Sequence, residues 1–323
     1  MKTATITEFD TKFEEDVYKG LTSYPKNLSS KYFYDEKGDK LFQQIMELPE
    51  YYLTNCEFDI LKQHKEAIVN AFQHENGFDL IELGAGDGKK TKILLNELVN
   101  EELAFNYLPV DISQNALNLL KKALNDELPQ VKVTPKQGTY FEILEKLGSY
   151  NQRKKVIMVL GSNIGNLPHA NAIDFLKQIR QSMSAGDLLF MGFDQKKDPQ
   201  IILDAYNDKT GVTAEFNKNI LTRINKEMGA NFDIDTFSHW EVYDPETGTA
   251  KSFLVAKEAH TVNIDALSLQ VSFDKWETIH TEISQKYDDK VVEWLAEQSG
   301  LAIDSSFSDL NNYYKNYLFT KLP

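Results

Sequence analysis

Residues 79–91 read Asp79-Leu80-Ile81-Glu82-Leu83-Gly84-Ala85-Gly86-Asp87-Gly88-Lys89-Lys90-Thr91. An apolar strand runs into a turn that contains three glycines, and a helix begins directly after the turn. Glycine lets the backbone turn tightly and approach a ligand closely, and the first turn of a helix presents N–H groups that have no partner within the helix. The sequence therefore predicts a nucleotide-binding turn in which Gly84 and Gly86 lie against the ligand.

Two ligand classes fit this turn, a dinucleotide and S-adenosylmethionine (SAM). The glycines follow the spacing GxGxG rather than GxGxxG, and Asp111 ends the next apolar segment, where a carboxylate accepts hydrogen bonds from a ribose. Asp87 in the turn would repel a pyrophosphate but is compatible with a cationic ligand, so the turn favours SAM over a nicotinamide dinucleotide. A helix start that binds nothing is the remaining interpretation, although three glycines at one strand end are costly without a ligand.

The composition is that of an ordinary globular enzyme. The chain has 323 residues, of which 41% are apolar, enough for two domains or one enlarged domain at about 100–200 residues each. A formal net charge of −14 repels phosphate backbones and anionic lipids, so we expect no nucleic-acid partner and no membrane. The single cysteine, Cys56, excludes an internal disulfide, and the six histidines are scattered, so we expect no metal site.

The first residues lack the pattern of a signal peptide, and no apolar run approaches the ~18 residues of a membrane span. We therefore expect a cytoplasmic protein that needs only small molecules as partners. We also expect a monomer.

Helices and strands alternate between residues 61 and 195. We expect strands at 78–83, 105–110, 130–135, 155–160 and 187–193, and helices at 55–73, 89–101, 114–125 and 170–184. Strands such as 156–160 are apolar on both faces, which is typical of a parallel sheet covered by helices. The sequence predicts an α/β fold with a doubly wound, mostly parallel sheet of Rossmann type.

The remaining segments do not follow this alternation. Residues 1–60 are rich in aromatic and charged residues and read as helices and loops, residues 198–231 read as helical, and residues 238–286 read as extended, with a hairpin turn at 245–248. We expect them to form a second, α+β domain that binds the substrate. The expected domains are 61–195 plus 287–323 for SAM and 1–60 plus 196–286 for the substrate.

Several motifs together resemble the histidine Nα-methyltransferase family of ergothioneine biosynthesis. Beside the glycine turn they are Lys31-Tyr32-Phe33-Tyr34-Asp35, Leu48-Pro49-Glu50-Tyr51-Tyr52, Pro109-Val110-Asp111, Leu160-Gly161-Ser162-Asn163-Ile164-Gly165-Asn166-Leu167, Ala205-Tyr206-Asn207-Asp208, Phe216-Asn217-Lys218-Asn219 and Thr281-Glu282-Ile283-Ser284. The resemblance covers most of the chain. It implies a class I methyltransferase core, a substrate domain, and SAM-dependent methylation of the α-amino group of L-histidine to Nα,Nα,Nα-trimethylhistidine (hercynine).

The resemblance also implies roles for individual residues. Gly84, Lys90 and Asp111 match the positions that hold SAM in the family. The positions that hold the amino-acid substrate are matched by Tyr51, Asn166, Tyr206, Glu282 and Ser284.

The chemistry of these residue types agrees with such roles. Glu282 and Ser284 are two residues apart in an expected strand, so both side chains project from one face. A carboxylate and a hydroxyl side by side orient the two nitrogens of an imidazole, and such a site rejects analogues that lack them. The amide of Asn166 and the phenol of Tyr206 are able to bind a carboxylate or an amine. Without the resemblance, a turn or packing role stays open for Asn166, Tyr206 and Tyr51, and a solvated strand face for Glu282.

The expected reaction demands little covalent chemistry from the protein. A neutral amine attacks the sulfonium methyl group in line, so the protein must orient the amine and let protons leave between transfers. A cationic donor nearby lowers the pKa of that amine. We hypothesise that no strong base is required and that Tyr34, or a water beside it, positions the amine. Aromatic faces accommodate the growing quaternary ammonium.

Two positions depart from the family pattern. Thr139-Tyr140 stands where relatives usually carry Asp-Phe for the adenine, so the threonine hydroxyl would replace a charge-assisted hydrogen bond. Ser252 stands where a methionine is common in the substrate pocket, and a smaller, polar wall admits a different side chain. An Nα-methyltransferase for another amino acid, such as tryptophan, therefore remains an alternative, as does a non-catalytic protein that binds SAM or an amino acid.

Overall fold

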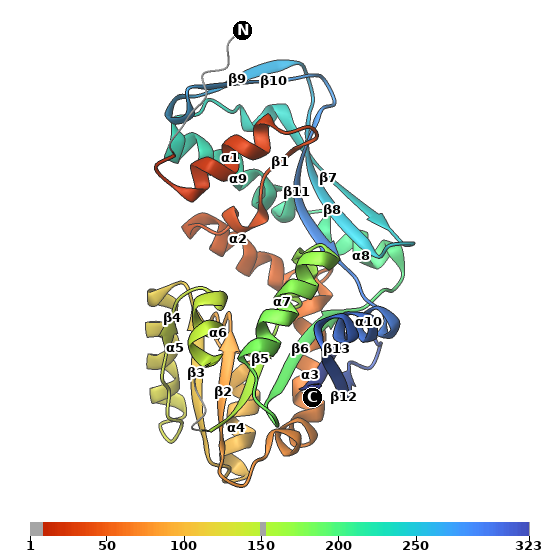
Figure 1. Cartoon of the computed structure of the whole chain (residues 1–323). Coiled ribbons are helices and arrows are strands. Elements are labelled where there is room, and N and C mark those ends of the chain that lie inside the picture. The colour runs from red at the N-terminus through yellow and green to blue at the C-terminus, as the bar shows by residue number, and fades with distance from the viewer. Residues whose placement is uncertain (1–8, 149–152, 323) are drawn as a thin grey trace. The chain divides into compact units, whose positions relative to one another are not determined.

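The computed structural model describes residues 9–148 and 153–322. The chain folds as two compact units, each made of two separate segments (Figure 1). Unit 1 comprises the described residues of 1–52 and residues 197–284, and unit 2 comprises those of 53–196 and 285–323. Residues 53–60 therefore fold with unit 2, although the sequence analysis groups them with the substrate domain. Among the described residues, no helix combines the length and the apolar character needed to cross a membrane.

Unit 2 is built around a seven-stranded sheet in the order β12-β13-β6-β5-β2-β3-β4 (Figure 1). The strands are β2 (Phe78–Leu83), β3 (Phe105–Asp111), β4 (Lys136–Gln137), β5 (Lys154–Val159), β6 (Leu188–Asp194), β12 (Leu301–Ser308) and β13 (Tyr314–Lys321). Strands β2 to β6 pair in parallel, whereas β13 pairs antiparallel with both β6 and β12. The strand order reverses at β2, between β3 and β5, where open α/β sheets bind ligands. The Rossmann-type, mostly parallel sheet expected from the sequence is confirmed.

Helices cover both faces of this sheet. They are α3 (Tyr52–Phe72), α4 (Thr91–Asn100) and α5 (Gln114–Glu127) on one face, and α6 (Tyr140–Gly148), α7 (His169–Ser182) and α10 (Asp289–Ser299) on the other. Strand β2 serves both layers, because Leu80 packs with the first set and Ile81 with the second. All six residues of β2 are buried, as expected for a strand covered on two sides.

Two local features of unit 2 differ from the sequence analysis. The strand expected at 130–135 is reduced to an isolated bridge between Val133 and Tyr107, and β4 begins only at Lys136. Pro135 explains the interruption, because proline has no N–H to donate to a strand ladder. Helix α6 was not expected.

Unit 1 is an α+β unit. Its strands are β1 (Lys26–Asn27), β7 (Phe237–Asp244), β8 (Thr249–Ala256), β9 (His260–Ile264), β10 (Leu269–Phe273) and β11 (Thr278–Gln285), and its helices include α1 (Lys12–Thr22), α2 (Glu36–Glu47), α8 (Pro199–Tyr206) and α9 (Val212–Met228). One sheet has the order β1-β11-β8-β7, and β9 and β10 form a separate pair. The hairpin turn expected at 245–248 is confirmed, because it joins β7 to β8 and the N–H of Gly248 donates to the Asp244 carbonyl at 2.8 Å.

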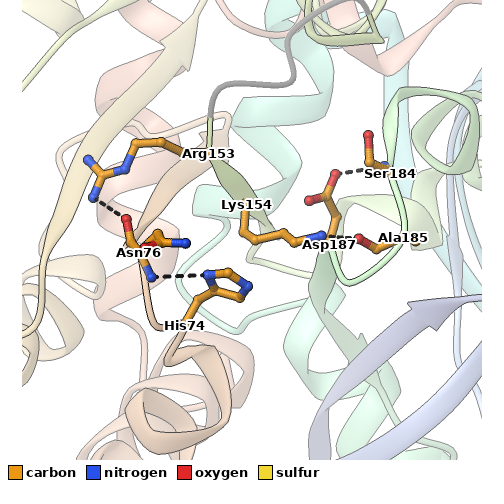
Figure 2. Close-up of a pocket in the computed structure, with 7 residues that line it drawn as sticks. All are labelled: His74, Asn76, Arg153, Lys154, Ser184, Ala185 and Asp187. Carbon is orange, nitrogen blue, oxygen red and sulfur yellow. Dashed lines mark hydrogen bonds between the residues drawn. The ribbon is translucent and has the colours of Figure 1, made fainter.

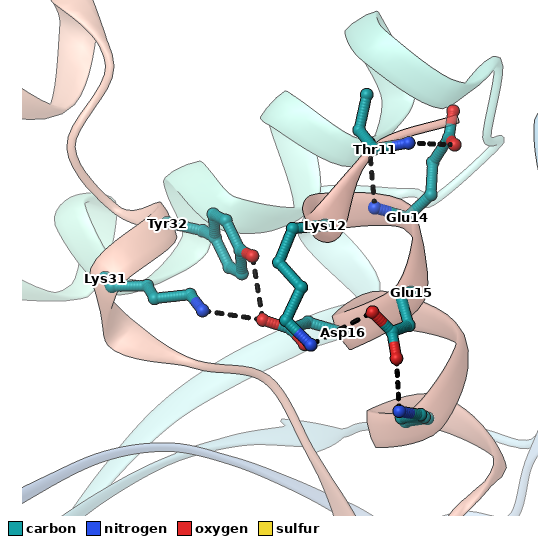
Figure 3. Close-up of polar contacts among 8 residues, drawn as sticks. Thr11, Lys12, Glu14, Glu15, Asp16, Lys31 and Tyr32 are labelled. Atoms are coloured by element: carbon teal, nitrogen blue, oxygen red, sulfur yellow. Dashed lines mark hydrogen bonds and ion pairs between the residues drawn. The ribbon is translucent and has the colours of Figure 1, made fainter. Parts of the chain in front are cut away.

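Helix α1 is tied to the segment that precedes α2 (Figure 3). Thr11 and Glu14 form a reciprocal capping box at its start, which satisfies two backbone N–H groups. The carboxylate of Asp16 accepts hydrogen bonds from Lys31 Nζ at 2.6 Å and from the Tyr32 hydroxyl at 2.8 Å. Partial burial raises the pKa of Asp16, but these hydrogen bonds outweigh it and hold the pKa at about 2. Asp16 is therefore ionised at neutral pH and anchors residues 31 and 32.

Candidate active site

The glycine turn after β2 has open space at one glycine and a close contact at another. Gly84 and Gly86 have φ values of +78° and +52°, in the left-handed region that side chains disfavour. A Cβ on Gly84 would lie 2.3 Å from the Tyr140 hydroxyl oxygen, whereas a Cβ on Gly86 would have nothing within 4 Å. Gly84 therefore permits contact with Tyr140, and Gly86 faces space that a ligand can occupy.

Asp111 lies beside this turn at the carboxyl end of β3. Its Oδ2 accepts a long hydrogen bond of 3.4 Å from the Gly86 N–H, and its Oδ1 accepts one of 2.8 Å from the Ser113 N–H. Burial raises the pKa of the Tyr140 hydroxyl to about 12, and the negative charges of Asp111 and Glu82 act in the same direction. The structure therefore gathers four of the expected SAM-binding residues, Gly84, Gly86, Asp111 and Tyr140.

Lys90 is held at the end of the turn by Glu57, a residue that the sequence analysis missed. Glu57 lies on α3, is completely buried, and forms an ion pair with Lys90 Nζ. The same carboxylate accepts hydrogen bonds from the Gly161 N–H at 2.8 Å and from the Tyr314 hydroxyl and the Asn316 amide at 3.0 Å each. Glu57 thus joins the glycine turn, the turn after β5 and strand β13.

A sequence signal for Glu57 exists. It shares one stripe of helix α3 with Leu53, Ile60 and Leu61, at positions i−4, i+3 and i+4, and all of these are buried. A carboxylate on the apolar face of a helix requires buried partners.

Glu82, the penultimate residue of β2, is a second buried acid that the sequence analysis gave no role. Its side chain accepts hydrogen bonds from the Thr91 hydroxyl at 2.6 Å and from the Tyr107 hydroxyl. Burial raises its pKa to about 7, against the opposing effect of these two hydrogen bonds. Since Thr91 is the first residue of α4, Glu82 fixes the start of that helix to the sheet.

Thr139 is engaged at the start of α6. Its N–H donates to Glu142 Oε2 at 2.9 Å, and its hydroxyl oxygen accepts a long hydrogen bond of 3.4 Å from the Glu142 N–H. The pair forms a capping box, and Tyr140 follows directly as the first residue of the helix. Thr139 therefore sets the position from which the Tyr140 ring reaches Gly84.

Asn166 closes a 3₁₀ turn, Asn163–Asn166, in unit 2. Two neighbours hold this turn after β5, because the Ser162 hydroxyl accepts from the Asp194 N–H at 2.9 Å and the Ile164 carbonyl accepts from the Tyr287 hydroxyl at 3.2 Å. Asn166 itself is exposed. The structure does not bring Asn166 into contact with the other predicted substrate residues, which belong to unit 1.

Three of those residues meet in unit 1. The Tyr206 hydroxyl and the Ser284 hydroxyl are hydrogen-bonded at 2.7 Å, and both residues are buried. The ring of Tyr51 lies edge-on to the ring of Tyr206, with centroids 6.4 Å apart. Tyr206 ends helix α8 and Ser284 lies near the end of β11, so residues far apart in sequence form one cluster. Glu282 lies two residues before Ser284 on the same strand and is half-buried.

Ser252 is buried in the β7–β8 hairpin of unit 1. It lies opposite Glu241 in the strand register, and its hydroxyl donates to Glu241 Oε2 at 2.6 Å. The Thr281 hydroxyl lies 3.1 Å from the Ser252 carbonyl and 2.8 Å from Asn217 Oδ1. Ser252 therefore brings a buried carboxylate with it, a partner that the sequence analysis did not identify.

Tyr34 lies in the loop before α2. Its ring is edge-on to Phe42 and to Phe216, with centroid distances of 5.5 and 5.4 Å. The residue is 42% exposed, so its ring has one packed side and one accessible side. This is suited to a phenol that contacts a small ligand.

A separate cavity of about 490 Å³ lies at the amino ends of β5 and β6 (Figure 2). Its walls include His74, Arg153, Lys154 and Asp187, none of which is a predicted site residue. Figure 2 shows how these groups are engaged, since Arg153 donates to the Asn76 carbonyl at 3.3 Å and Lys154 donates to the Ala185 carbonyl. Ligands of open α/β sheets bind at the opposite, carboxyl ends of the strands.

Within residues 9–148 and 153–322, no group of three or more His, Cys, Asp or Glu side chains has an arrangement that could hold a metal ion.

Comparison with known proteins identifies relatives over almost the whole chain. A family model described as "Histidine-specific methyltransferase, SAM-dependent" matches residues 13–321. The chain is 37% identical to the histidine N-alpha-methyltransferase of Mycolicibacterium smegmatis over 283 residues, which is 87% of each chain. It is 36% identical to the protein of the same name from Mycobacterium tuberculosis, over 86% of this chain and 85% of the other. It is also 30% identical to ergothioneine biosynthesis protein 1 of Schizosaccharomyces pombe, over 91% of this chain and 39% of the other.

Proposed function

The chain belongs to the family of SAM-dependent, histidine-specific methyltransferases, and we propose that it converts L-histidine to Nα,Nα,Nα-trimethylhistidine by three successive transfers from SAM. Membership of this family decides between the two ligand classes that fit the glycine turn, in favour of SAM over a nicotinamide dinucleotide. The number of transfers and the individual roles of the residues are the proposed part.

The observation that carries the proposal is the buried cluster of Tyr51, Tyr206 and Ser284 in unit 1. Two hydroxyl groups 2.7 Å apart offer donors and acceptors that a polar ligand is able to share. Glu282, on the same strand as Ser284, adds a carboxylate. An imidazole presents one N–H donor and one acceptor nitrogen, so a carboxylate and a hydroxyl pair with both of its nitrogens.

For the donor, the residues that fit are those around the open side of Gly86 in unit 2. Asp111 supplies a carboxylate for ribose hydroxyls, and the backbone at Gly84 and Gly86 allows close approach. When bound, SAM supplies an electrophilic methyl carbon on a positively charged sulfur. Lys90 is neutralised by Glu57, so it does not add a free positive charge that would oppose this cation.

In each transfer, the lone pair of the neutral α-amino nitrogen forms a bond to the methyl carbon as the carbon–sulfur bond breaks. The nitrogen then carries one proton that must leave before the next transfer, until the third methyl group gives a quaternary ammonium. We propose that Tyr34 orients the nitrogen through its hydroxyl and that Asn166 binds the amino acid through its amide. The aromatic rings around Tyr34 suit the growing cationic head.

The test is mass spectrometry of L-histidine after incubation with the protein and SAM that carries a deuterated methyl group. We expect histidine with one, two and finally three labelled methyl groups, and nuclear magnetic resonance should place all three on the α nitrogen. Products that stop at one or two methyl groups, or a methyl group on the ring, would contradict the proposal.

Ser252 supports one second candidate, an Nα-methyltransferase for another amino acid. The hydroxyl of Ser252 is already donated to the buried carboxylate of Glu241, so this wall is polar and charged rather than apolar. Such a wall disfavours an indole and is compatible with a polar ring. Competition among histidine, tryptophan and phenylalanine at equal concentration should therefore give labelled histidine first, and faster labelling of tryptophan would favour the second candidate.

A further inference from the structure

The loop that carries Tyr34 is held by one face of helix α9. Phe216, Asn219 and Arg223 are spaced three and four residues apart, so their side chains project from the same side of the helix. Phe216 packs edge-on against Tyr34 and Phe33, with ring centroids 5.4 and 5.0 Å apart. The other two residues act on the backbone of the same loop.

Asn219 uses both of its N–H donors on this loop. Its Nδ2 donates to the Phe33 carbonyl at 3.3 Å and to Asp35 Oδ1 at 2.8 Å. These two acceptors flank Tyr34 in the sequence. Because both contacts require a donor, they also fix which end of the amide faces the loop. Asn219 is 1% exposed, so water cannot replace these hydrogen bonds without entering the core.

Two further contacts complete the support. Arg223 Nη1 donates to the carbonyl oxygens of Tyr32 at 3.2 Å and Tyr34 at 3.4 Å. Asp35 caps helix α2 through the Gly38 N–H at 2.8 Å, and a Cβ on Gly38 would lie 1.8 Å from the Phe33 carbonyl oxygen. The backbone on both sides of Tyr34 is therefore constrained by α9 and by the start of α2.

We propose that Asn219 and Arg223 are positioning residues that hold Tyr34 in the orientation required for methyl transfer. This inference rests on the proposed function of Tyr34. Neither side chain needs to touch the substrate. A tyrosine that is 42% exposed and packed on one side only has no other rigid support for its backbone among the printed contacts of residues 32–35 than these donors and the α2 cap. A displacement of about 1 Å in a group that orients a nucleophile is enough to reduce the rate about 100-fold.

The test compares Asn219→Ala with a matched variant on the same helix, Asn225→Ala. Asn225 also makes two hydrogen bonds to backbone, donating to the Phe232 carbonyl and accepting from the Phe232 N–H at 2.8 Å each, but it does not contact residues 32–35. We expect Asn219→Ala to lower kcat about 10- to 100-fold with little change in KM for SAM. Asn225→Ala should lower the melting temperature by a comparable amount and leave kcat within about twofold.

A double-mutant cycle with Tyr34→Phe separates positioning from a general loss of stability. If Asn219 acts through Tyr34, adding Asn219→Ala to Tyr34→Phe should cost no more than about threefold in kcat, because the interacting group is already lost. Full multiplication of the two single effects would overturn the inference. A loss of kcat in Asn225→Ala equal to that in Asn219→Ala would also overturn it.

Amide hydrogen exchange tests the same support without any assay of methylation. We expect faster exchange in the peptide spanning residues 33–39 for Asn219→Ala and for Arg223→Ala, and unchanged exchange there for Asn225→Ala. Unchanged exchange in the first two variants would overturn the inference even if the enzyme trimethylates histidine. Conversely, a wild-type protein that does not methylate histidine would overturn the proposed function, whatever the exchange result.

Discussion

Replacing Glu57 by glutamine should weaken both the fold of unit 2 and the binding of the donor. The two oxygens of Glu57 each receive two donors, Lys90 and the Gly161 N–H at Oε2, and the hydroxyl of Tyr314 and the amide of Asn316 at Oε1. A glutamine of the same shape keeps one oxygen and turns an NH₂ group toward the other pair of donors. Two donors in a buried site then lose their partners.

The magnitude follows from this count. Each buried donor left without a partner costs about 1–3 kcal/mol. Lys90 is 25% exposed at its side chain and regains some hydration, so we expect a loss near the middle, about 3 kcal/mol in the free energy of unfolding. For a unit of this size, that corresponds to a fall of about 6–12 °C in melting temperature. If Lys90 loses its charged partner, the affinity for S-adenosylhomocysteine should fall about 10- to 100-fold.

Denaturant unfolding and titration calorimetry with S-adenosylhomocysteine measure the two effects. Glu97→Gln is the matched control, because Glu97 is also a buried glutamate of unit 2 paired with a lysine, Lys65 at 2.6 Å, but it lies on α4 away from the turn. Tyr314→Phe removes one donor from Glu57 and leaves Lys90 and Gly161 in place, so it should cost about 1 kcal/mol of stability without loss of affinity. Equal stabilities and affinities for Glu57→Gln and Glu97→Gln would refute the reasoning.

Three further predictions concern single contacts. Because the pKa of Glu82 is raised from 4.5 to about 7 in the folded state, its contribution to stability is full below pH 4.5 and should decline by about 3 kcal/mol as pH rises through 7; Glu82→Gln should remove that decline in urea unfolding across this range, and an unchanged profile would contradict the assigned burial. Tyr206→Phe, which deletes the hydroxyl bonded to Ser284, should raise KM for histidine about tenfold and leave KM for SAM unchanged in initial-rate assays, whereas equal rises would argue against a substrate role. Gly84→Ala should cost about 1–3 kcal/mol and weaken donor binding through its clash with the Tyr140 hydroxyl, and Tyr140→Phe in the same chain should restore part of both; no restoration would mean that backbone strain alone is responsible.

The core of unit 2 could be predicted because its signals are local. Strand β2 is apolar at every position that contacts a helix layer, and the glycine turn marks its end. The same kind of local signal was available for helix α6, since Thr139 and Glu142 have the T-x-x-E spacing of a capping box. The strand expected at 130–135 failed for an equally local reason, because Pro135 cannot donate to a ladder.

The candidate site was predictable in composition but not in geometry. Resemblance to a family groups Tyr51, Tyr206 and Ser284, yet no periodicity in the sequence says that the last two hydroxyls are 2.7 Å apart. That distance depends on how α8 ends against β11, a contact between segments almost eighty positions apart. Asn219 illustrates the same limit, because its partners at Phe33 and Asp35 lie in a different segment of unit 1.

The two departures from the family pattern show why single positions are a poor unit of comparison. Thr139, read alone, is a lost carboxylate for the adenine, but in the structure it caps α6 together with Glu142. Ser252, read alone, is a smaller pocket wall. In the structure its hydroxyl is donated across the hairpin to Glu241, and a buried hydroxyl and a buried carboxylate stabilise each other only as a pair. Because a methionine at position 252 would remove that donor and leave a buried carboxylate beside an apolar side chain, residues 241 and 252 must be compared together, and the polarity of this wall is a property of the pair.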